Sequence, residues 1–116
     1  MVMDNICTLL NAYLSCTEFE NVLFCWVMHE QAIIDGILRR TGGHKCRTFC
    51  RTLVCSPDAL ADRLNADIQS GLREPDVLPR ALDRLERCLA LDTVKLDTTG
   101  LTVMDTATML FKEITE

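Results

Sequence analysis

The sequence predicts a mainly α fold, in which residues 1–116 form a single helical domain, a compact bundle of five to six helices. Apolar residues recur at helical spacing through most of the chain, which is typical of amphipathic helices. Ser, Thr and Asp stand where these patterns begin, and only 3 prolines and 5 glycines interrupt the chain. The 116 residues suit one domain, and a hydrophobic fraction of 48% is enough for its core.

Two helices are expected in the first 40 residues. Asp4 can cap the first one, and its apolar face would consist of Ile6, Leu9, Leu10, Tyr13 and Leu14. The second helix is expected from Glu18 to Arg40. Thr17 and Glu20 have the spacing of a capping box at its start, and Gly42 follows its basic last turn.

The middle of the chain predicts three further helices. Residues 44–55 carry an apolar stripe at helical spacing, formed by Cys46, Phe49, Cys50, Leu53 and Val54. The next helix is expected to begin after Ser56, with Pro57 at its first position, and to end at Gly71. Another helix follows residues 74–76 and carries regularly spaced leucines as far as Leu89.

The last quarter of the chain changes character. Apolar and polar residues alternate there, with the apolar positions at Val94, Leu96, Leu101 and Val103. This pattern predicts either a short β-hairpin at residues 94–103 or an irregular loop, because two strands alone are only marginally stable in water. Asp105 then predicts the cap of a C-terminal helix, with Leu110 and Phe111 on its apolar face.

The net charge of −5 is distributed unevenly along the chain. Residues 1–35 contain five acids and no Lys or Arg, whereas residues 36–57 contain five basic residues and no acid. We call these five residues the basic island: Arg39, Arg40, Lys45, Arg47 and Arg51. An acidic chain binds nucleic acid poorly, so the expected partner of the island is an acidic protein surface rather than nucleic acid.

The seven cysteines are an odd number, so they cannot all pair within one chain. The first residues, Met1 to Asp4, lack the basic start of a secretory leader. Free thiols in a reducing, intracellular compartment, cytoplasmic or nuclear, are therefore expected. The longest apolar run, residues 22–28, is far shorter than the roughly 20 residues that a membrane span needs, so no membrane span is expected.

One cluster of metal-ligating residue types consists of His44, Cys46, Cys50 and Cys55. Zinc takes thiolate and imidazole ligands at close range, so the alternative function is a zinc-stabilised or nucleic-acid-associated helical module that uses the His44–Cys55 segment. Paired Cys-x2-Cys ligands are missing, and two of these cysteines lie on the apolar stripe. We therefore expect no metal or other cofactor.

No motif in the sequence predicts a reaction. His29 and Glu30 begin like a metalloprotease helix, but Ile33 stands where the second histidine is required. A Gly-x-Ser-x-Gly elbow and a complete phosphate-binding loop are both missing. We therefore expect no enzyme and no catalytic residue.

The strongest functional candidate is the expected second helix. A helix that faces one core needs an apolar stripe, but residues 22–28 are apolar on every side. Either the helix is wrapped at the centre of the bundle, or one side is a shared surface, most simply in a homodimer. We therefore predict a small intracellular protein–protein interaction module, an adaptor or regulator, that binds a partner through this apolar helix. The predicted partner-binding residues are Phe19, Leu23, Trp26 and Val27, together with the basic island.

Overall fold

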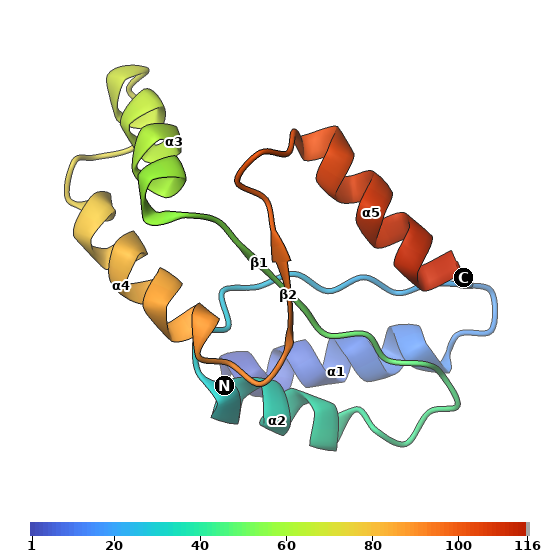
Figure 1. Cartoon of the computed structure of the whole chain (residues 1–116). Helices are drawn as coiled ribbons and strands as arrows, with labels where there is room; N and C mark the ends of the chain where they lie inside the picture. The colour runs from blue at the N-terminus through green and yellow to red at the C-terminus, as the bar shows by residue number, and fades with distance from the viewer. Residues whose placement is uncertain (116) are drawn as a thin grey trace. The chain divides into compact units, whose positions relative to one another are not determined.

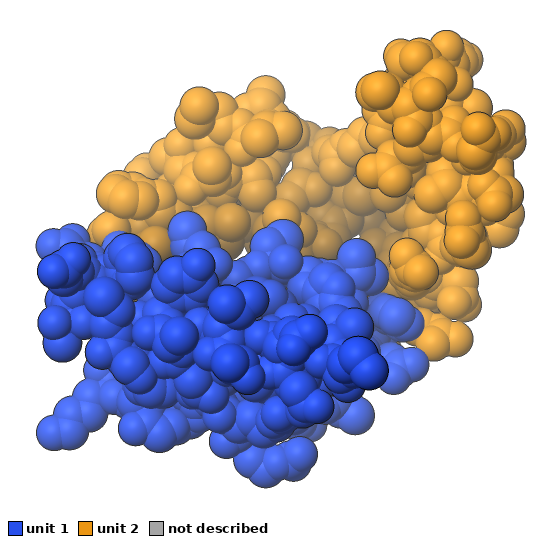
Figure 2. Space-filling view, turned by 180° about the vertical axis from the view of Figure 1, so that it is seen from behind, with its two compact units in different colours: residues 1–48 blue, residues 49–116 orange. Residues whose placement is uncertain are grey.

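The computed structural model describes residues 1–115 and is mainly helical, as the sequence predicts (Figure 1). Its elements are α1 (Val2–Ser15), α2 (Gln31–Arg40), β1 (Arg51–Val54), α3 (Pro57–Gln69), α4 (Val77–Leu89), β2 (Val94–Asp97) and α5 (Val103–Thr115). Every helix within residues 1–115 is too short or too polar to cross a membrane. Two compact units divide the chain, unit 1 at residues 1–48 and unit 2 at residues 49–116 (Figure 2). That residues 1–116 form a single helical domain stays a prediction.

Unit 1 consists of α1, α2 and the segment between them. The two helices run in the same direction, so the chain travels back along them through residues 16–30, which we call the return segment (Figure 1). The 14 residues of α1 span about 21 Å, a distance that about seven extended residues can cover. The return therefore needs no helix. Cys7 on α1 and Ile34 and Ile37 on α2 are the buried hydrophobic residues of this unit.

Polar contacts fasten the end of α2 to α1. The Nη2 of Arg40 donates to the Oδ1 of Asp4 at 2.7 Å, and this hydrogen bond lowers the pKa of Asp4 and raises that of Arg40. The Nδ2 of Asn11 donates to the backbone carbonyl of Arg40 at 3.1 Å. The Oδ1 of Asn11 also lies 2.8 Å from the Nε2 of His44. The side chain of Asn11 therefore contacts both the end of α2 and the stretch that follows it.

The predicted helix from Glu18 to Arg40 is wrong over its first half. Residues 21–29 have no regular secondary structure, and α2 begins only at Gln31. Many residues of this stretch are β-branched or aromatic, and such side chains lose rotational freedom in a helix. The apolar run has no polar side and so no single face for a helix to bury. A run this short fits a strand as well as a buried helix.

Unit 2 is built around two parallel strands. β1 and β2 pair in register from Arg51 opposite Val94 to Val54 opposite Asp97. Parallel strands need a crossover connection, which α3 and α4 provide here. Helix α3 packs on α4, and α4 packs on β1. The buried hydrophobic residues of the unit are Val54, Leu64, Leu85, Leu91 and Leu96.

The helix predicted for residues 44–55 is wrong. Arg51–Val54 form the strand β1, and residues 47–50 have no regular secondary structure. Thr and Val favour strands, so the same residues suit both patterns. The backbone partner of β1 is β2, which lies about 40 residues away in the sequence, and helical spacing alone cannot reveal such a partner.

The predicted hairpin at residues 94–103 is also wrong, although its first half is the strand β2. β2 pairs with β1, and residues 101 and 102 do not form a returning strand. The N–H of Thr98 donates to the carbonyl of Val54 at 2.7 Å and so continues the pairing with β1. The Oδ1 of Asp97 accepts hydrogen bonds from the N–H and the hydroxyl of Thr99, which favours a turn there. The chain then enters α5.

Side-chain caps begin α3 and α5. The Oγ of Ser56 accepts a hydrogen bond from the N–H of Ala59 at 3.1 Å, as predicted. At α5 the N–H of Thr102 donates to Asp105, and the N–H of Asp105 donates to the hydroxyl of Thr102, both at 3.0 Å. The predicted cap, Asp105, is therefore the second member of a capping box that Thr102 opens.

Candidate interaction surface

The return segment exposes the apolar side chains that were predicted to bind a partner. Their exposed fractions are 52% for Phe19, 84% for Leu23, 40% for Trp26 and 54% for Val27. Within residues 1–115, residues 17–28 take part in no hydrogen bond. Their backbone N–H and C=O groups are therefore left to water. The segment combines exposed apolar side chains with an unpaired backbone.

All six aromatic side chains of the chain are exposed. They are Tyr13, Phe19, Phe24, Trp26, Phe49 and Phe111, and each is at least 37% exposed. Aromatic rings usually supply much of a domain core, because each buries a large apolar area. Here the buried hydrophobic residues are aliphatic or cysteine. Four of the six rings lie between residues 13 and 26, so the uncovered aromatic surface is concentrated in unit 1.

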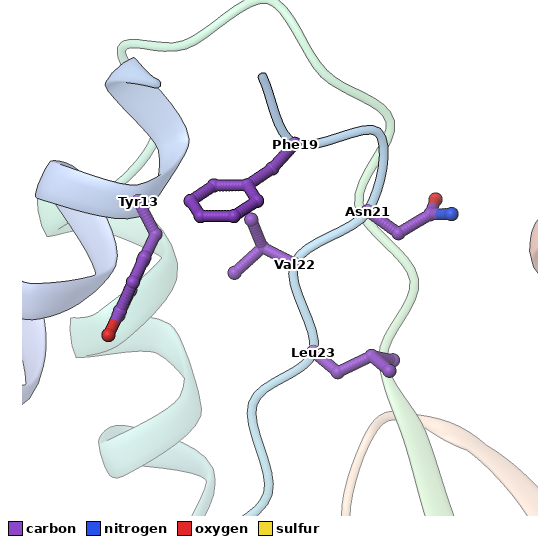
Figure 3. A pocket seen from close by; sticks show the side chains of 5 residues that line it. All are labelled: Tyr13, Phe19, Asn21, Val22 and Leu23. Carbon is purple, nitrogen blue, oxygen red and sulfur yellow. The ribbon is translucent and has the colours of Figure 1, made fainter. Parts of the chain in front are cut away.

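A shallow hollow of about 190 Å³ lies where the return segment passes α1 (Figure 3). It is lined by Tyr13, Phe19, Asn21, Val22 and Leu23. The rings of Tyr13 and Phe19 meet edge to face, with centroids 5.8 Å apart and planes at 62°. This contact holds the start of the return segment against α1. The mainly apolar side chains that line the hollow stay open to solvent beside this contact.

Neighbouring side chains of the return segment leave the backbone on opposite sides. Val22 points toward Tyr13 and Phe19, whereas Asn21 and Leu23 point the other way (Figure 3). Such alternation is the geometry of a β-strand. Residues 21–23 are thus strand-like in the directions of their side chains, and they have no strand partner among the described residues.

The basic island is spread over several elements. Arg39 and Arg40 end α2, Lys45 and Arg47 lie in the stretch without helix or strand that follows, and Arg51 begins β1. All but Arg51 are exposed. Arg47 and Arg51 do not share a helix, as the helix predicted for residues 44–55 would require, because Arg51 belongs to a strand.

Arg40 and Arg51 each form an ion pair within their own unit. Arg40 pairs with Asp4, as described above. The Nε of Arg51 lies 2.5 Å from the Oε2 of Glu113 on α5, and its guanidinium lies 5.5 Å from the centre of the Phe49 ring. Their charges are therefore partly matched by the chain's own residues.

The four candidate zinc ligands are divided between the two units. His44 and Cys46 belong to unit 1, whereas Cys50 and Cys55 belong to unit 2. Nowhere in residues 1–115 do three His, Cys, Asp or Glu side chains gather closely enough to hold a metal. All seven cysteines are free thiols, and burial raises the pKa of the Cys88 thiol. The four candidates form no zinc site in the described chain.

Exposed apolar residues that were not predicted to be part of a surface include Tyr13, Leu53 and Val94. Tyr13 and Leu53 were assigned to core faces of helices, and Val94 to the hairpin, yet they are 49%, 50% and 54% exposed. The density of aromatic residues between residues 13 and 26 is the signal that could have identified Tyr13 as part of the surface. Leu53 and Val94 lie on paired strands, and no local pattern reveals that pairing.

No protein-family model matches this chain, and none of the curated proteins or solved structures compared with it is a match. Its function is therefore argued from its own residues.

Proposed function

We propose that this chain is a small protein–protein interaction module, an adaptor or regulator, whose contact surface consists of the return segment and Tyr13 of α1. The partner is another protein, and the simplest one is a second copy in a two-fold homodimer. The observation that carries this proposal is the joint exposure of Phe19, Leu23, Trp26 and Val27 within residues 17–28, whose backbone has no hydrogen-bond partner within residues 1–115.

The residue types of this surface support association. Tyr, Trp, Phe and Met are enriched in the cores of protein interfaces, and the return segment contains members of this group between Phe19 and Met28. Apolar area removed from water contributes about 25 cal/mol per Å², so covering these rings is favourable. A partner protein also supplies the backbone or side-chain groups that the segment lacks.

The basic island adds electrostatic specificity to the proposed interface. Arg39, Lys45 and Arg47 are exposed on a chain whose net charge is −5. Charged groups at the rim of an interface mainly set the association rate and exclude wrong partners. An acidic protein surface fits these residues. We propose that the interaction takes place in a reducing, intracellular compartment, and the seven free thiols support this proposal.

Light scattering after size exclusion tests the proposal. The molar mass of the full chain is expected to rise from one chain to two with increasing concentration. The emission of Trp26, the chain's only tryptophan, is expected to shift to shorter wavelength over the same range. Leu23→Ser is expected to weaken this association. Leu72→Ser is the matched control, because Leu72 is a comparably exposed leucine, at 75%, in unit 2.

The same variants serve as baits for a heterologous partner. A protein retained by wild type and by Leu72→Ser, but lost by Leu23→Ser, identifies the return segment as its binding surface. A chain that stays monomeric at every concentration, and whose Leu23→Ser and Leu72→Ser variants retain the same proteins, contradicts the proposed function.

A further inference from the structure

We infer that the return segment joins a second copy of this chain by strand addition. Residues 22–28 of one copy line up parallel beside residues 49–55 of the other and extend the sheet of β1 and β2 by one strand. This inference rests on the proposed function, and it specifies how the contact surface pairs and with what.

The donor strand is residues 22–28. They carry no hydrogen bond within residues 1–115, and side chains at the start of this stretch alternate in direction (Figure 3). Val, Phe and Trp are residue types that strands favour. An extended apolar peptide with an unpaired backbone binds most directly by adding to the edge of a sheet, where its main-chain groups find partners.

The acceptor is the edge of β1 that faces away from β2. In residues 1–115 the sheet has only these two strands, so this edge has no strand neighbour. Parallel strands normally occur in larger sheets that are covered on both faces, and a pair of strands alone is marginal. Leu53 on β1 and Val94 on β2 are half exposed, so part of the sheet's apolar surface is uncovered.

Charge determines the register and the partner. A shift of 27 positions places the seven residues 22–28 opposite residues 49–55, and it places Glu18 opposite Lys45 and Glu20 opposite Arg47. All four charged residues are exposed. Residues 1–35 contain no Lys or Arg, and residues 36–57 contain no acid, so the stretches that precede the donor and the acceptor are of opposite charge. A slip of one residue would turn every side chain to the other face.

The same register extends the face of the sheet that carries the half-exposed Leu53 and Val94. Residues that stand opposite each other in a parallel pair share a face, so Phe24 would lie beside Arg51 and Trp26 beside Leu53. Phe24 is 37% and Trp26 is 40% exposed before pairing. Cross-strand contacts between aromatic and aliphatic side chains stabilise sheets.

The partner is a second copy because every chain contains both the donor strand and the acceptor edge. Residues 1–115 contain one apolar strand preceded by acids and one sheet edge preceded by basic residues, so two copies can exchange strands reciprocally. Such an exchange gives a closed two-fold dimer rather than an open chain of molecules.

Charge exchange between two copies tests the register. Glu20→Lys and Arg47→Glu are each expected to weaken dimerisation about tenfold, because each places like charges opposite each other twice in the dimer. A mixture of the two variants is expected to regain the wild-type dissociation constant, because both contacts of the mixed dimer then join opposite charges. Asp62→Lys, which makes the same charge change on an exposed position of α3, is the matched control and is expected to dimerise like wild type.

The outcome of mixing separates the alternatives. If the return segment pairs within its own chain, the double variant recovers but the mixture does not, and the inference is wrong. If the chain dimerises and neither single variant is weakened, strand addition in this register is wrong while the proposed function stands. A chain that does not dimerise at all contradicts the inference and the homodimer together.

A proline scan tests the strand pairing itself. In a parallel pair only every second residue of the added strand directs its N–H to the neighbour, and proline removes that donor. Prolines placed singly at positions 22, 23, 24 and 25 are therefore expected to abolish dimerisation at alternate positions. At the other positions they are expected to weaken it no more than alanine does. Dissociation constants without this alternation overturn strand addition.

Discussion

At the scale of single residues, two aspartates are tied to backbone groups of short turns. The N–H of Thr102 donates to Asp105 and lowers its pKa, and the hydroxyl of Thr99 does the same for Asp97. In both cases the ionised carboxylate is the better acceptor, so the folded chain holds these groups as anions more firmly than the unfolded chain does. One turn leads into α5, and the other follows β2.

These pKa shifts predict how stability depends on pH. A carboxyl whose pKa is lowered on folding adds stability that is fully present above the unfolded pKa of about 3.9 and is lost as pH falls through the folded pKa. The free energy of unfolding is therefore expected to fall below about pH 5. Asp105→Asn is expected to make that decline shallower in denaturant titrations at several pH values. Asp62→Asn controls for the lost charge, and equal slopes for wild type and Asp105→Asn would contradict the assignment.

At the scale of elements, the end of α3 depends on a single glycine. Gly71 has a φ of +78°, which L side chains rarely adopt. Its N–H donates to the carbonyl of Ile68, and the N–H of Leu72 donates to that of Asp67, which together form a Schellman motif. The left-handed residue allows both bonds, so the helix terminates where the chain must turn toward α4.

Substitution of this glycine should cost stability. Gly71→Ala is expected to lower the free energy of unfolding by about 1 kcal/mol, because a Cβ is disfavoured in the left-handed region. Gly100→Ala is the matched control, since Gly100 has no positive φ and nothing lies within 4 Å of an added Cβ. Chemical denaturation of both variants measures the difference. Equal effects of the two substitutions would show that the φ of Gly71 carries no cost.

The elements that sequence reasoning recovered have local signals. Ser56 and Pro57 mark the start of α3 and Gly71 its end, and each acts within a few residues. β1 has no such signal, because its hydrogen bonds go to a strand about 40 residues away. The return segment was mistaken for a helix because an apolar run of seven residues has no distinguishing period.

The candidate surface was chosen by composition, and its role in binding stays a prediction. The predicted residues were selected because residues 22–28 seemed too apolar for one small core to cover. In the structure these side chains are exposed, which agrees with an excess of apolar surface: Phe19, Leu23, Trp26 and Val27. Their conformation was assigned wrongly, so the predicted docking helix is an extended segment. The exposure of Leu53 and Val94 depends on tertiary packing, which local patterns do not encode.

At the scale of the whole molecule, the division into two units predicts where a protease acts first. Lys45 and Arg47 lie in residues 41–50, which contain no helix or strand, and both are exposed. Brief trypsin digestion of the full chain is expected to cut after one of them before it cuts within any helix, because proteases need an unfolded stretch. Mass spectrometry of the first products identifies the bond. A first cut inside α3 or α4 would contradict this division.

The absence of aromatic rings from the buried core described above has a thermodynamic consequence. Unfolding raises heat capacity in proportion to the apolar surface that becomes newly exposed, about 1.5 kcal/mol/K for a typical chain of this length. A chain whose rings are partly exposed when it is folded exposes less new apolar surface on unfolding. Calorimetry of dilute samples should therefore give a smaller heat-capacity increment. The stability of the isolated chain should then vary only weakly with temperature, and the curvature should grow once a partner covers the rings.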